Sequence, residues 1–308
     1  MRLITFVDDA ADDAPPRVGA VEGDRVRDLS ALVAALPLAP RAARALQARG
    51  GDPKTPSMLK LLLAGDAGLE RVRAALAVPA AAPGPALAAV ELLAPVPRPG
   101  KVIAIGRNYG EHAKESGSTA FEQPRVIAKL PSAVCGPGTR VAIPAAVTKP
   151  DYEVELGVVI GAFARDVPQQ YALDYVAGYT VLDDISAREF QFDVSPPQTT
   201  FAKSFDQSCP MGPWLVTRDE IADVQRLDIA CRINGETLQQ ANTADMLFPV
   251  DRLIAYISRY MTLEPGDVIA TGTPAGVGAF RQPPRWLVSG DRVELSVEGV
   301  GTLVHGIA

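Results

Sequence analysis

Two acidic residues, Glu153 and Glu155, are separated by one residue within an otherwise mostly apolar segment, residues 151–156. On a β-strand, successive side chains alternate between the two faces, so these carboxylates would point to the same side. Neighbouring carboxylates repel each other and are costly to bury without a cation. Oxygen ligands favour a hard cation, which indicates Mg²⁺ or Mn²⁺, with Ca²⁺ also possible. A solvated strand face that carries two acids is the alternative interpretation.

A third acid, Asp184, follows the apolar residues Val181 and Leu182. It could complete a three-carboxylate metal site with Glu153 and Glu155. Asp also frequently caps a helix, by accepting hydrogen bonds from the first backbone N–H groups. Spacing alone therefore leaves both interpretations of Asp184 open.

The chain contains two histidines, and one of them, His112, is followed three residues later by Glu115. In a helical turn these two side chains would be neighbours on one face. A carboxylate next to an imidazole raises its basicity and fixes its orientation, as a general base requires. A surface histidine with a local helix contact is the alternative. His305, near the C-terminus, is interpreted as incidental.

Two further segments could contact an anion. Lys203 lies in a largely apolar setting, where it could neutralise an oxyanion or a substrate carboxylate, although a surface lysine with a buried stem is the more usual interpretation. Residues 271–278 form a Gly-rich segment that could present backbone N–H groups to a carboxylate. The segment lacks the Gly-Lys-Ser/Thr ending of a nucleotide-binding loop, and a plain turn is its alternative interpretation.

The elements that position these residues are mostly strands. Apolar patterns and turn signals predict an α+β, mainly β fold, because strands outnumber helices and do not alternate regularly with them. Residues 77–99 hold six prolines, which indicates a linker between a small N-terminal α/β unit, residues 1–76, and a catalytic domain, residues 100–308. Strands are expected at residues 2–7, 18–21, 26–29, 102–105, 152–160, 227–233, 268–270 and 293–297, and helices at 29–36, 41–48, 57–63 and 250–257.

Composition restricts the partners. The 308 residues carry a formal charge of -6, which argues against nucleic acid or an anionic membrane as the main partner. Three widely spaced cysteines fit a reducing compartment without disulfides. The first residues do not resemble a signal peptide, so a cytoplasmic location is expected.

Six segments between residues 100 and 308 resemble, in matching order, the fumarylacetoacetate hydrolase family. Each motif is weak alone, and their ordered co-occurrence is specific. The segments are Gly106-Arg107-Asn108-Tyr109, Asp151-Tyr152-Glu153-Val154-Glu155-Leu156, Asp184-Ile185-Ser186-Ala187-Arg188-Glu189-Phe190-Gln191, Ala202-Lys203-Ser204-Phe205-Asp206, Gly212-Pro213-Trp214 and Gly272-Thr273-Pro274-Ala275-Gly276-Val277-Gly278.

The resemblance implies a fold and a role for each matching residue. The fold would be a mixed β-roll, usually a homodimer, and the N-terminal unit resembles the extension of longer bacterial members. The eukaryotic hydrolase has a further metal-ligand acid at the position of Arg107, so the chain is more similar to acylpyruvase-type members. The implied metal ligands are Glu153, Glu155 and Asp184, the catalytic residues His112, Glu115 and Lys203, and the substrate-binding residues Arg107, Tyr109, Arg188, Gln191 and Thr273.

The implied activity is metal-dependent hydrolysis of a C–C bond in an acylpyruvate or a 2,4-dioxo acid. His112, supported by Glu115, would activate water, and the metal would stabilise a pyruvate enolate. The positive charge of Arg107, Arg188 and Lys203 suits a substrate with more than one anionic end. Oxaloacetate decarboxylation and isomerisation or dehydration of a 2-oxo acid are alternatives at the same site. A non-catalytic, metal-stabilised binding protein is the alternative from another class.

Residues 110–123 are expected to form a lid. They contain little apolar surface, several small residues and the proposed His112–Glu115 pair. Such a segment is expected to be mobile when the site is empty and to become ordered over a bound substrate.

Overall fold

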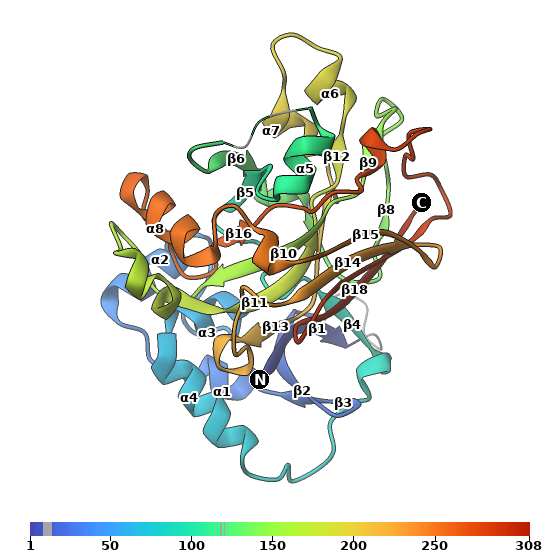
Figure 1. The fold of residues 1–308 in the computed structure, drawn as a ribbon. Coiled ribbons are helices and arrows are strands. Elements are labelled where there is room, and N and C mark those ends of the chain that lie inside the picture. Colours follow the sequence, from blue (N-terminus) through green and yellow to red (C-terminus); the bar gives the residue numbers. More distant parts are fainter. Residues whose placement is uncertain (9–13, 118, 120) are drawn as a thin grey trace.

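A large mixed sheet runs through the molecule, which a computed structural model describes at residues 1–8, 14–117, 119 and 121–308 (Figure 1). Within these residues the sheet has eleven strands, nine of them in the order β3-β2-β1-β13-β11-β10-β16-β5-β6, with β4 paired to β1 and β7 to β13. The strands are β1 (Arg2–Asp8), β2 (Arg17–Glu22), β3 (Arg25–Asp28), β4 (Val90–Leu93), β5 (Val102–Gly106), β6 (Arg125–Lys129), β7 (Val134–Cys135), β10 (Val154–Ile160), β11 (Val176–Asp183), β13 (Cys209–Thr217) and β16 (Val268–Ala270).

Smaller sheets complete the β structure. A five-stranded sheet has the order β15-β14-β17-β18-β8, and the short strands β9 and β12 pair with each other. The bounds are β8 (Arg140–Val141), β9 (Pro150–Asp151), β12 (Ser186–Ala187), β14 (Asp228–Ile233), β15 (Glu236–Asn242), β17 (Arg292–Val297) and β18 (Gly301–Ile307). The predominance of strands confirms the predicted α+β, mainly β class.

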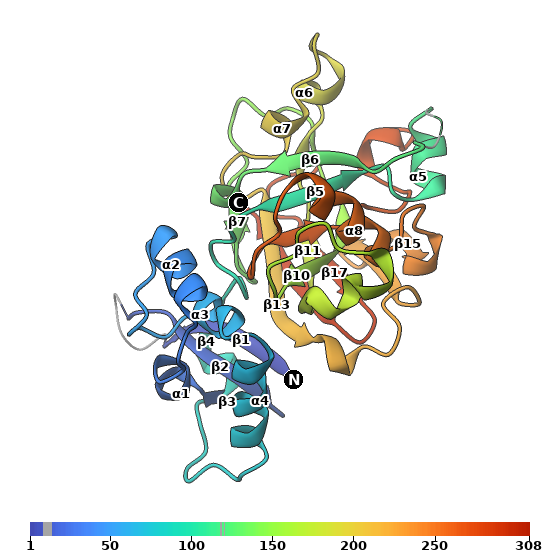
Figure 2. The same ribbon diagram turned by 90° about the vertical axis from the view of Figure 1, so that its left-hand side faces the viewer.

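The helices are short and lie around the sheets. Figure 2 shows α1–α4 gathered beside β1–β4 at one end of the molecule, with α6 and α7 at the opposite end. None of the helices within the described residues is long and apolar enough to cross a membrane. The helices are α1 (Ser30–Ala34), α2 (Pro40–Ala48), α3 (Met58–Leu63), α4 (Gly65–Leu76), α5 (Gly110–Glu115), α6 (Glu189–Phe192), α7 (Thr199–Ala202) and α8 (Val250–Tyr260).

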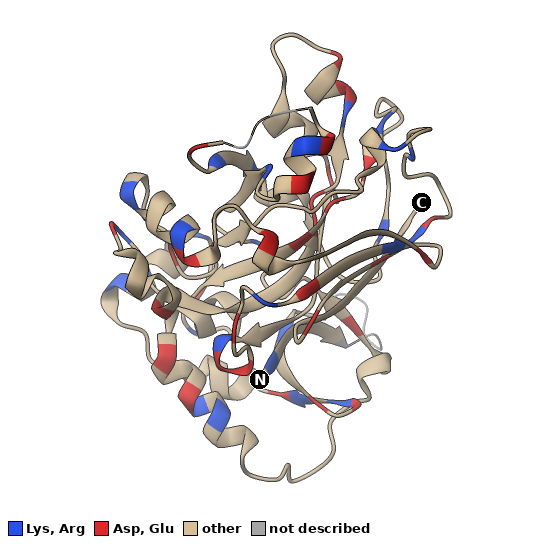
Figure 3. Cartoon of the chain, viewed as in Figure 1, with Lys and Arg blue, Asp and Glu red and all other residues tan. Residues whose placement is uncertain are grey.

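Charged residues of both signs are interspersed on the outer helices. Figure 3 shows acidic and basic positions next to each other on α4 and on α5. On α5, exposed Lys114 forms an ion pair with exposed Glu111. Such exposed pairs contribute little stability to the folded protein.

The central strands β10 and β11 position the site. Every residue of both strands is buried, which explains their nearly continuous apolar sequences. They pair antiparallel, with Val154 opposite Asp183 and Glu155 opposite Leu182. The N-terminal end of β10 therefore lies beside the C-terminal end of β11, and acids from both ends meet there.

The expected linker contains regular structure. Residues 90–93 form β4, which pairs with β1, and a short 3₁₀ helix (Leu87–Ala89) precedes it. This differs from a structureless linker, because the apolar residues Val90, Leu92 and Leu93 lie between the prolines. One hydrophobic cluster also contains Leu3 and Leu61 from the N-terminal unit together with Leu215 from β13. The N-terminal unit and the catalytic region thus share core packing.

His305 is not incidental, in contrast to the expectation from the sequence. It is fully buried on β18, and its Nε2 lies 2.9 Å from Asp183 Oδ2. The other oxygen of Asp183 accepts a hydrogen bond of 2.8 Å from the backbone N–H of Glu153. His305 is therefore linked through Asp183 to the backbone of a candidate metal ligand.

Candidate active site

A cavity of about 290 Å³ opens at the ends of β5, β6 and β10. This volume is at the lower limit of ligand pockets, so the cavity fits a small molecule. Nine of the eleven residues that the sequence predicted for the site line it, and Glu115 and Tyr109 do not. The nine are Arg107, His112, Glu153, Glu155, Asp184, Arg188, Gln191, Lys203 and Thr273.

Three buried carboxylates meet on one wall of this cavity. Glu153, Glu155 and Asp184 each offer an oxygen that lies within 4.8 Å of the other two. The backbone N–H of Asp184 donates a 3.0 Å hydrogen bond to the carbonyl of Glu153, which fixes the two strand ends against each other. Asp184 thus belongs to the acidic cluster, and it does not cap a helix.

Lys203 bridges two of the three acids. Its Nζ lies 2.7 Å from Glu153 Oε2, 2.5 Å from Asp184 Oδ2 and 2.9 Å from Ser186 Oγ. Burial alone would lower the pKa of Lys203, but the charges of Asp184 and Glu153 raise that pKa above its usual value. Burial likewise opposes ionisation of Glu153, whereas Lys203 and Arg188 hold the pKa of Glu153 below its usual range.

Glu155 has less compensation from positive charge. Burial, followed by the nearby charges of Asp184 and Glu153, raises the pKa of Glu155 well above its usual value. One of its oxygens accepts a 2.7 Å hydrogen bond from the backbone N–H of Gly272. A cation placed among the three acids would favour the ionised form of Glu155 and so lower its pKa again.

The donor set fits a divalent, hard metal ion. All three groups are carboxylates, the ligands that Mg²⁺ and Mn²⁺ prefer. Asp184 Oδ1 accepts no well-aligned hydrogen bond from the described residues, although Lys129 Nζ lies 2.9 Å away. This oxygen therefore keeps a lone pair that is available to a ligand.

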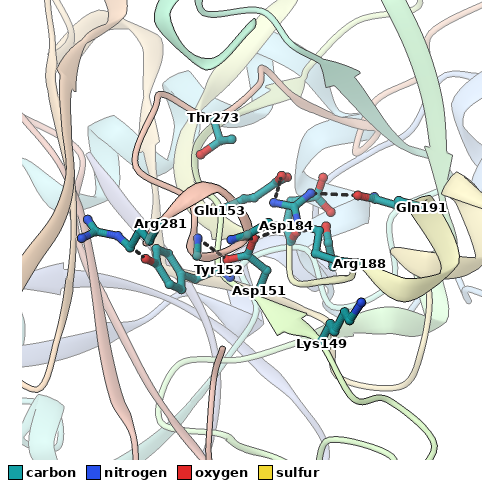
Figure 4. A network of polar contacts seen from close by, with 12 residues as sticks. Lys149, Asp151, Tyr152, Glu153, Asp184, Arg188, Gln191, Thr273 and Arg281 are labelled. Atoms are coloured by element: carbon teal, nitrogen blue, oxygen red, sulfur yellow. Dashed lines mark hydrogen bonds and ion pairs between the residues drawn. The ribbon is translucent and has the colours of Figure 1, made fainter. Parts of the chain in front are cut away.

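Arg188 contacts the carboxylate oxygen of Glu153 that Lys203 does not contact, and Figure 4 shows Arg188 between Glu153, Asp151 and Gln191. Its Nη2 donates to Glu153 Oε1 at 2.7 Å, its Nε to Asp151 Oδ2 at 2.8 Å, and its Nη1 to Gln191 Oε1 at 2.8 Å. Asp151 is itself fixed by the backbone N–H groups of Gly278 and Ala279. Because three protein acceptors occupy its guanidinium, Arg188 orients Glu153 and Gln191 at the cavity wall.

His112 and Glu115 form a hydrogen-bonded pair on α5. The His112 Nδ1 and Glu115 Oε1 atoms are 2.7 Å apart, and Glu115 Oε2 accepts a 2.9 Å hydrogen bond from the backbone N–H of Gly276. The imidazole lines the cavity, while Glu115 lies behind it. A neutral His112 that donates from Nδ1 to this carboxylate keeps the lone pair of Nε2 for a proton.

The Gly-rich segment contacts carboxylates of the protein itself. Its N–H groups at Gly272, Gly276 and Gly278 donate to Glu155, Glu115 and Asp151 respectively. The sequence predicted N–H groups that could bind an anion, and in the structure three of these N–H groups are used by carboxylates of the protein. One segment thereby positions a candidate metal ligand, the acid of the His112 pair and the partner of Arg188.

Of the two expected substrate-contact residues Thr273 and Tyr109, only Thr273 lines the cavity. The Oγ1 atom of Thr273 accepts a 2.8 Å hydrogen bond from Gln239. Tyr109 is buried outside the cavity lining, and its hydroxyl has no hydrogen-bond partner among the described residues. The structure therefore does not bring Tyr109 to the cavity, because its ring packs into the hydrophobic core.

Sequence reasoning missed three charged residues of the site. Lys129 is buried against Asp184, Asp151 is paired with Arg188, and Arg125 lines the cavity. Asp151 is the first residue of the acidic motif, which was an available signal. Lys129 and Arg125 lie at the two ends of a strand with no local feature that marks them.

The chain is similar to known enzymes over most of its length. The model of the fumarylacetoacetate (FAA) hydrolase C-terminal family matches residues 101–308. The mitochondrial oxaloacetate tautomerase of Bos taurus is 42% identical over 255 residues, which cover 83% of this chain and 80% of the relative. Among solved structures, maleylpyruvate hydrolase from Sphingobium sp. SYK-6, in complex with manganese (II) ion and pyruvate, has a TM-score of 0.77 and 34% identity, covering 100% of this chain and 99% of that one. Fumarylacetoacetate hydrolase from Exiguobacterium antarcticum has a TM-score of 0.77 and 33% identity at the same coverage.

Proposed function

Because this chain belongs to the fumarylacetoacetate hydrolase family, we propose that it is a divalent-metal-dependent enzyme that hydrolyses a C–C bond of an acylpyruvate or a 2,4-dioxo acid. The observation that carries the proposal is the His112–Glu115 pair, whose imidazole lines the same cavity as the three carboxylates. Hydrolysis of a carbonyl compound requires a base that activates water, and here the candidate base would lie next to the metal ion.

Glu153, Glu155 and Asp184 would hold the metal ion, which we expect to be Mg²⁺ or Mn²⁺. A divalent cation supplies Lewis-acid stabilisation for the keto and carboxylate oxygens of a 2-oxo acid. Arg188 and Lys203 keep Glu153 ionised and oriented for this role, since both donate hydrogen bonds to it. The manganese and pyruvate in the Sphingobium enzyme support this assignment.

His112 would remove a proton from water, and Glu115 would stabilise the resulting imidazolium. The water oxygen attacks the distal carbonyl carbon, and the C–C bond to the pyruvoyl methylene breaks. The electron pair of that bond passes to the pyruvoyl unit as an enolate, which takes up a proton to give pyruvate. The other product is the carboxylic acid of the acyl group. Lys203 would offset the negative charge that develops on the oxygen of the attacked carbonyl.

Tautomerisation of oxaloacetate is a second candidate, supported by the 42% identity to the bovine oxaloacetate tautomerase. In that reaction His112 would move a proton between a carbon and an oxygen of the substrate, and no water would be consumed. Decarboxylation of oxaloacetate passes through a similar enolate. A binding protein without catalysis would not need the hydrogen-bonded base that lines the cavity.

A side-by-side assay tests the proposal. With Mg²⁺ or Mn²⁺ present, wild type is given acetylpyruvate, fumarylpyruvate or oxaloacetate, while pyruvate release and loss of enol absorbance are followed separately. We expect water-consuming cleavage of an acylpyruvate to have the highest kcat/KM. If only enol–keto exchange of oxaloacetate is accelerated, hydrolysis is the wrong assignment and the tautomerase replaces it.

A further inference from the structure

The backbone N–H group of Glu153 is held by a side chain rather than by a neighbouring strand. Strand β10 begins one residue later, at Val154, which is paired with Asp183 at the end of β11. The N–H group of Glu153 donates to Asp183 Oδ1 at 2.8 Å. The next N–H group, that of Val154, donates to Gln239 Oε1 at 3.1 Å. Side chains therefore take the place of a strand partner where β10 meets the candidate metal site.

Asp183 is completely buried, and each of its two oxygens makes one of the contacts that matter here. Oδ1 accepts from Glu153, and Oδ2 lies 2.9 Å from His305 Nε2. Within the described residues, His305 is the only basic side chain within 4.0 Å of Asp183. A carboxylate oxygen is an acceptor, so Nε2 is assigned as the donor. A carboxylate held through one oxygen alone can still rotate, and the contact to His305 fixes its plane.

His305 reaches this carboxylate from the second sheet. It lies on β18 opposite Val293 of β17, and its side chain is buried. Its other ring nitrogen, Nδ1, has no hydrogen-bond partner among the described residues, so the contact to Asp183 is the one that the imidazole makes. A buried polar ring costs free energy unless its hydrogen bonds are made, and an apolar side chain would fill this position at lower cost. The retained imidazole points to a role for its single contact.

We infer that His305 is a positioning residue of the metal site, which fixes Asp183 and thereby the backbone of the candidate ligand Glu153. Asp183 also directly precedes Asp184, so the same contact helps to locate two of the three acids. Partners behind the metal ligands orient those ligands and tune the affinity for the ion. The inference rests on the proposed function, in which the three acids hold a divalent metal ion.

This role differs from that of the two cations at the site. Arg188 and Lys203 donate to the carboxylate of Glu153, at the end of a flexible side chain. His305 acts at the other end of the same residue, on its backbone, through Asp183. Replacing His305 would leave both cations in contact with Glu153 and would loosen its backbone. Metal affinity is therefore the quantity that should respond.

Isothermal titration with Mn²⁺ measures that affinity in wild type and three variants. His305→Phe keeps a buried ring without a donor, and His305→Gln keeps an amide N–H group that can reach Asp183 in place of Nε2. Leu303→Ala is the matched control, because Leu303 lies two residues away on the same buried face of β18. The thermal unfolding temperature of each metal-free variant is measured alongside, which separates a loss of stability from a loss of metal binding.

We expect His305→Phe to raise the Kd for Mn²⁺ roughly 10-fold, the lower end of the usual cost of losing a partner behind a metal ligand, and His305→Gln to recover most of this affinity. Leu303→Ala should lower the unfolding temperature and leave the Kd unchanged. A Kd that is the same in wild type and His305→Phe would overturn the inference. So would a loss in His305→Gln or Leu303→Ala as large as that in His305→Phe.

Two further outcomes are decisive. If His305→Phe does not fold, the smaller His305→Leu takes its place, and failure of both to fold would mean that position 305 serves stability alone, which overturns the inference. If wild type itself does not bind Mn²⁺, the metal site of the proposed function fails and this inference fails with it. Binding by wild type that His305→Phe leaves intact would refute the positioning role and uphold the metal site.

Discussion

The imidazole of His112 depends on a chain of contacts that begins in a distant part of the sequence. Gly276 donates to Glu115, and Glu115 contacts His112. Each link is a hydrogen bond to a carboxylate, and such bonds are stronger than those between neutral groups. These two contacts therefore set the orientation of the imidazole.

The first prediction concerns this base. Replacing His112 by Ala is expected to lower kcat by roughly 10²–10⁴-fold, the usual contribution of general acid–base catalysis, and to leave Mn²⁺ affinity nearly unchanged. Glu115→Gln should have a smaller effect in the same direction. Lys114→Ala is the matched control, because Lys114 lies on the same helix with its side chain in solvent. A His112→Ala variant with wild-type kcat would assign the pair a structural role.

The second prediction concerns the metal ligands. Glu155→Gln removes the carboxylate whose pKa burial and its acidic neighbours raise, so it should weaken Mn²⁺ binding severely while the apo protein stays folded. Wild type should lose activity in excess chelator and regain it with Mg²⁺ or Mn²⁺. Isothermal titration with Mn²⁺ measures the affinity. Full activity with chelator present would contradict a metal site.

The sequence pointed to the candidate metal ligands and to the candidate base because each carries a local signal. Glu153 and Glu155 alternate on a strand, and His112 and Glu115 have helical spacing. Lys129 was missed because its partner Asp184 is distant in the chain, and Arg125 was missed because the cavity that it lines exists only in the folded protein. His305 was misjudged for the same reason as Lys129, since only the pairing of β18 with the rest of the molecule reveals Asp183 beside it.

At the scale of elements, the Gly-rich segment after β16 connects the parts of the site. It combines positive φ at Gly272 and Gly276, 102° and 104°, with close approach to neighbouring backbone. A Cβ atom at Gly276 would lie 2.2 Å from the carbonyl oxygen of Leu238. Glycine is therefore required at this position for space as well as for conformation.

The third prediction follows from that geometry. Gly276→Ala should displace the N–H group that holds Glu115, lowering kcat and reducing the free energy of unfolding by more than the roughly 1–2 kcal/mol of a left-handed backbone alone. Gly235→Ala is the control, because Gly235 has a similar φ of 87° with open space around it. Urea unfolding and kcat are measured for both. Equal stability losses in the two variants, with unchanged kcat, would contradict the assigned role.

The fourth prediction concerns the lid expected at residues 110–123, of which residues 118 and 120 lie outside the described part of the structure. Of the six residues in α5, only His112 and Ala113 are buried, so few contacts hold the helix when the cavity is empty. With Mn²⁺ present, oxalate should slow amide hydrogen exchange in α5. Exchange in α8, which has six buried residues, serves as the internal reference. Identical exchange in α5 with and without oxalate would argue against a lid.

Element boundaries could be predicted where the pattern was strong. The hairpin of β2 and β3 and the amphipathic helix α8 were expected from turn residues and apolar spacing. Strands β11 and β13 were not expected, because Gly178 in β11 and the Gly and Pro residues of β13 interrupt a strand pattern. Helix α4 was missed because its Gly65 and Gly68 weaken the helical signal.

At the scale of the whole molecule, the sheet joins the two regions that the sequence separated. Arg2 and Leu3 of β1 pair with Val216 and Leu215 of β13, which extends the catalytic sheet into the N-terminal unit. The proline content of residues 77–99 indicated a boundary, yet the core crosses it. The homodimer and the cytoplasmic location that the family resemblance and composition suggested stay predictions, which light scattering and fractionation would test.

The fifth prediction is that the N-terminal unit and the catalytic region unfold together. Leu61 of α3 is fully buried in the cluster that contains Leu215 of β13, so Leu61→Ala should cost roughly 2–5 kcal/mol and lower one common unfolding temperature. Mn²⁺ at about 100 times its Kd should raise that same temperature, because it adds roughly 2.7 kcal/mol to the native state. Val78→Ala, at an exposed position, should change little and is the control. Differential scanning calorimetry distinguishes the outcomes: a separate transition that Leu61→Ala shifts and Mn²⁺ does not would mean that the N-terminal unit folds on its own.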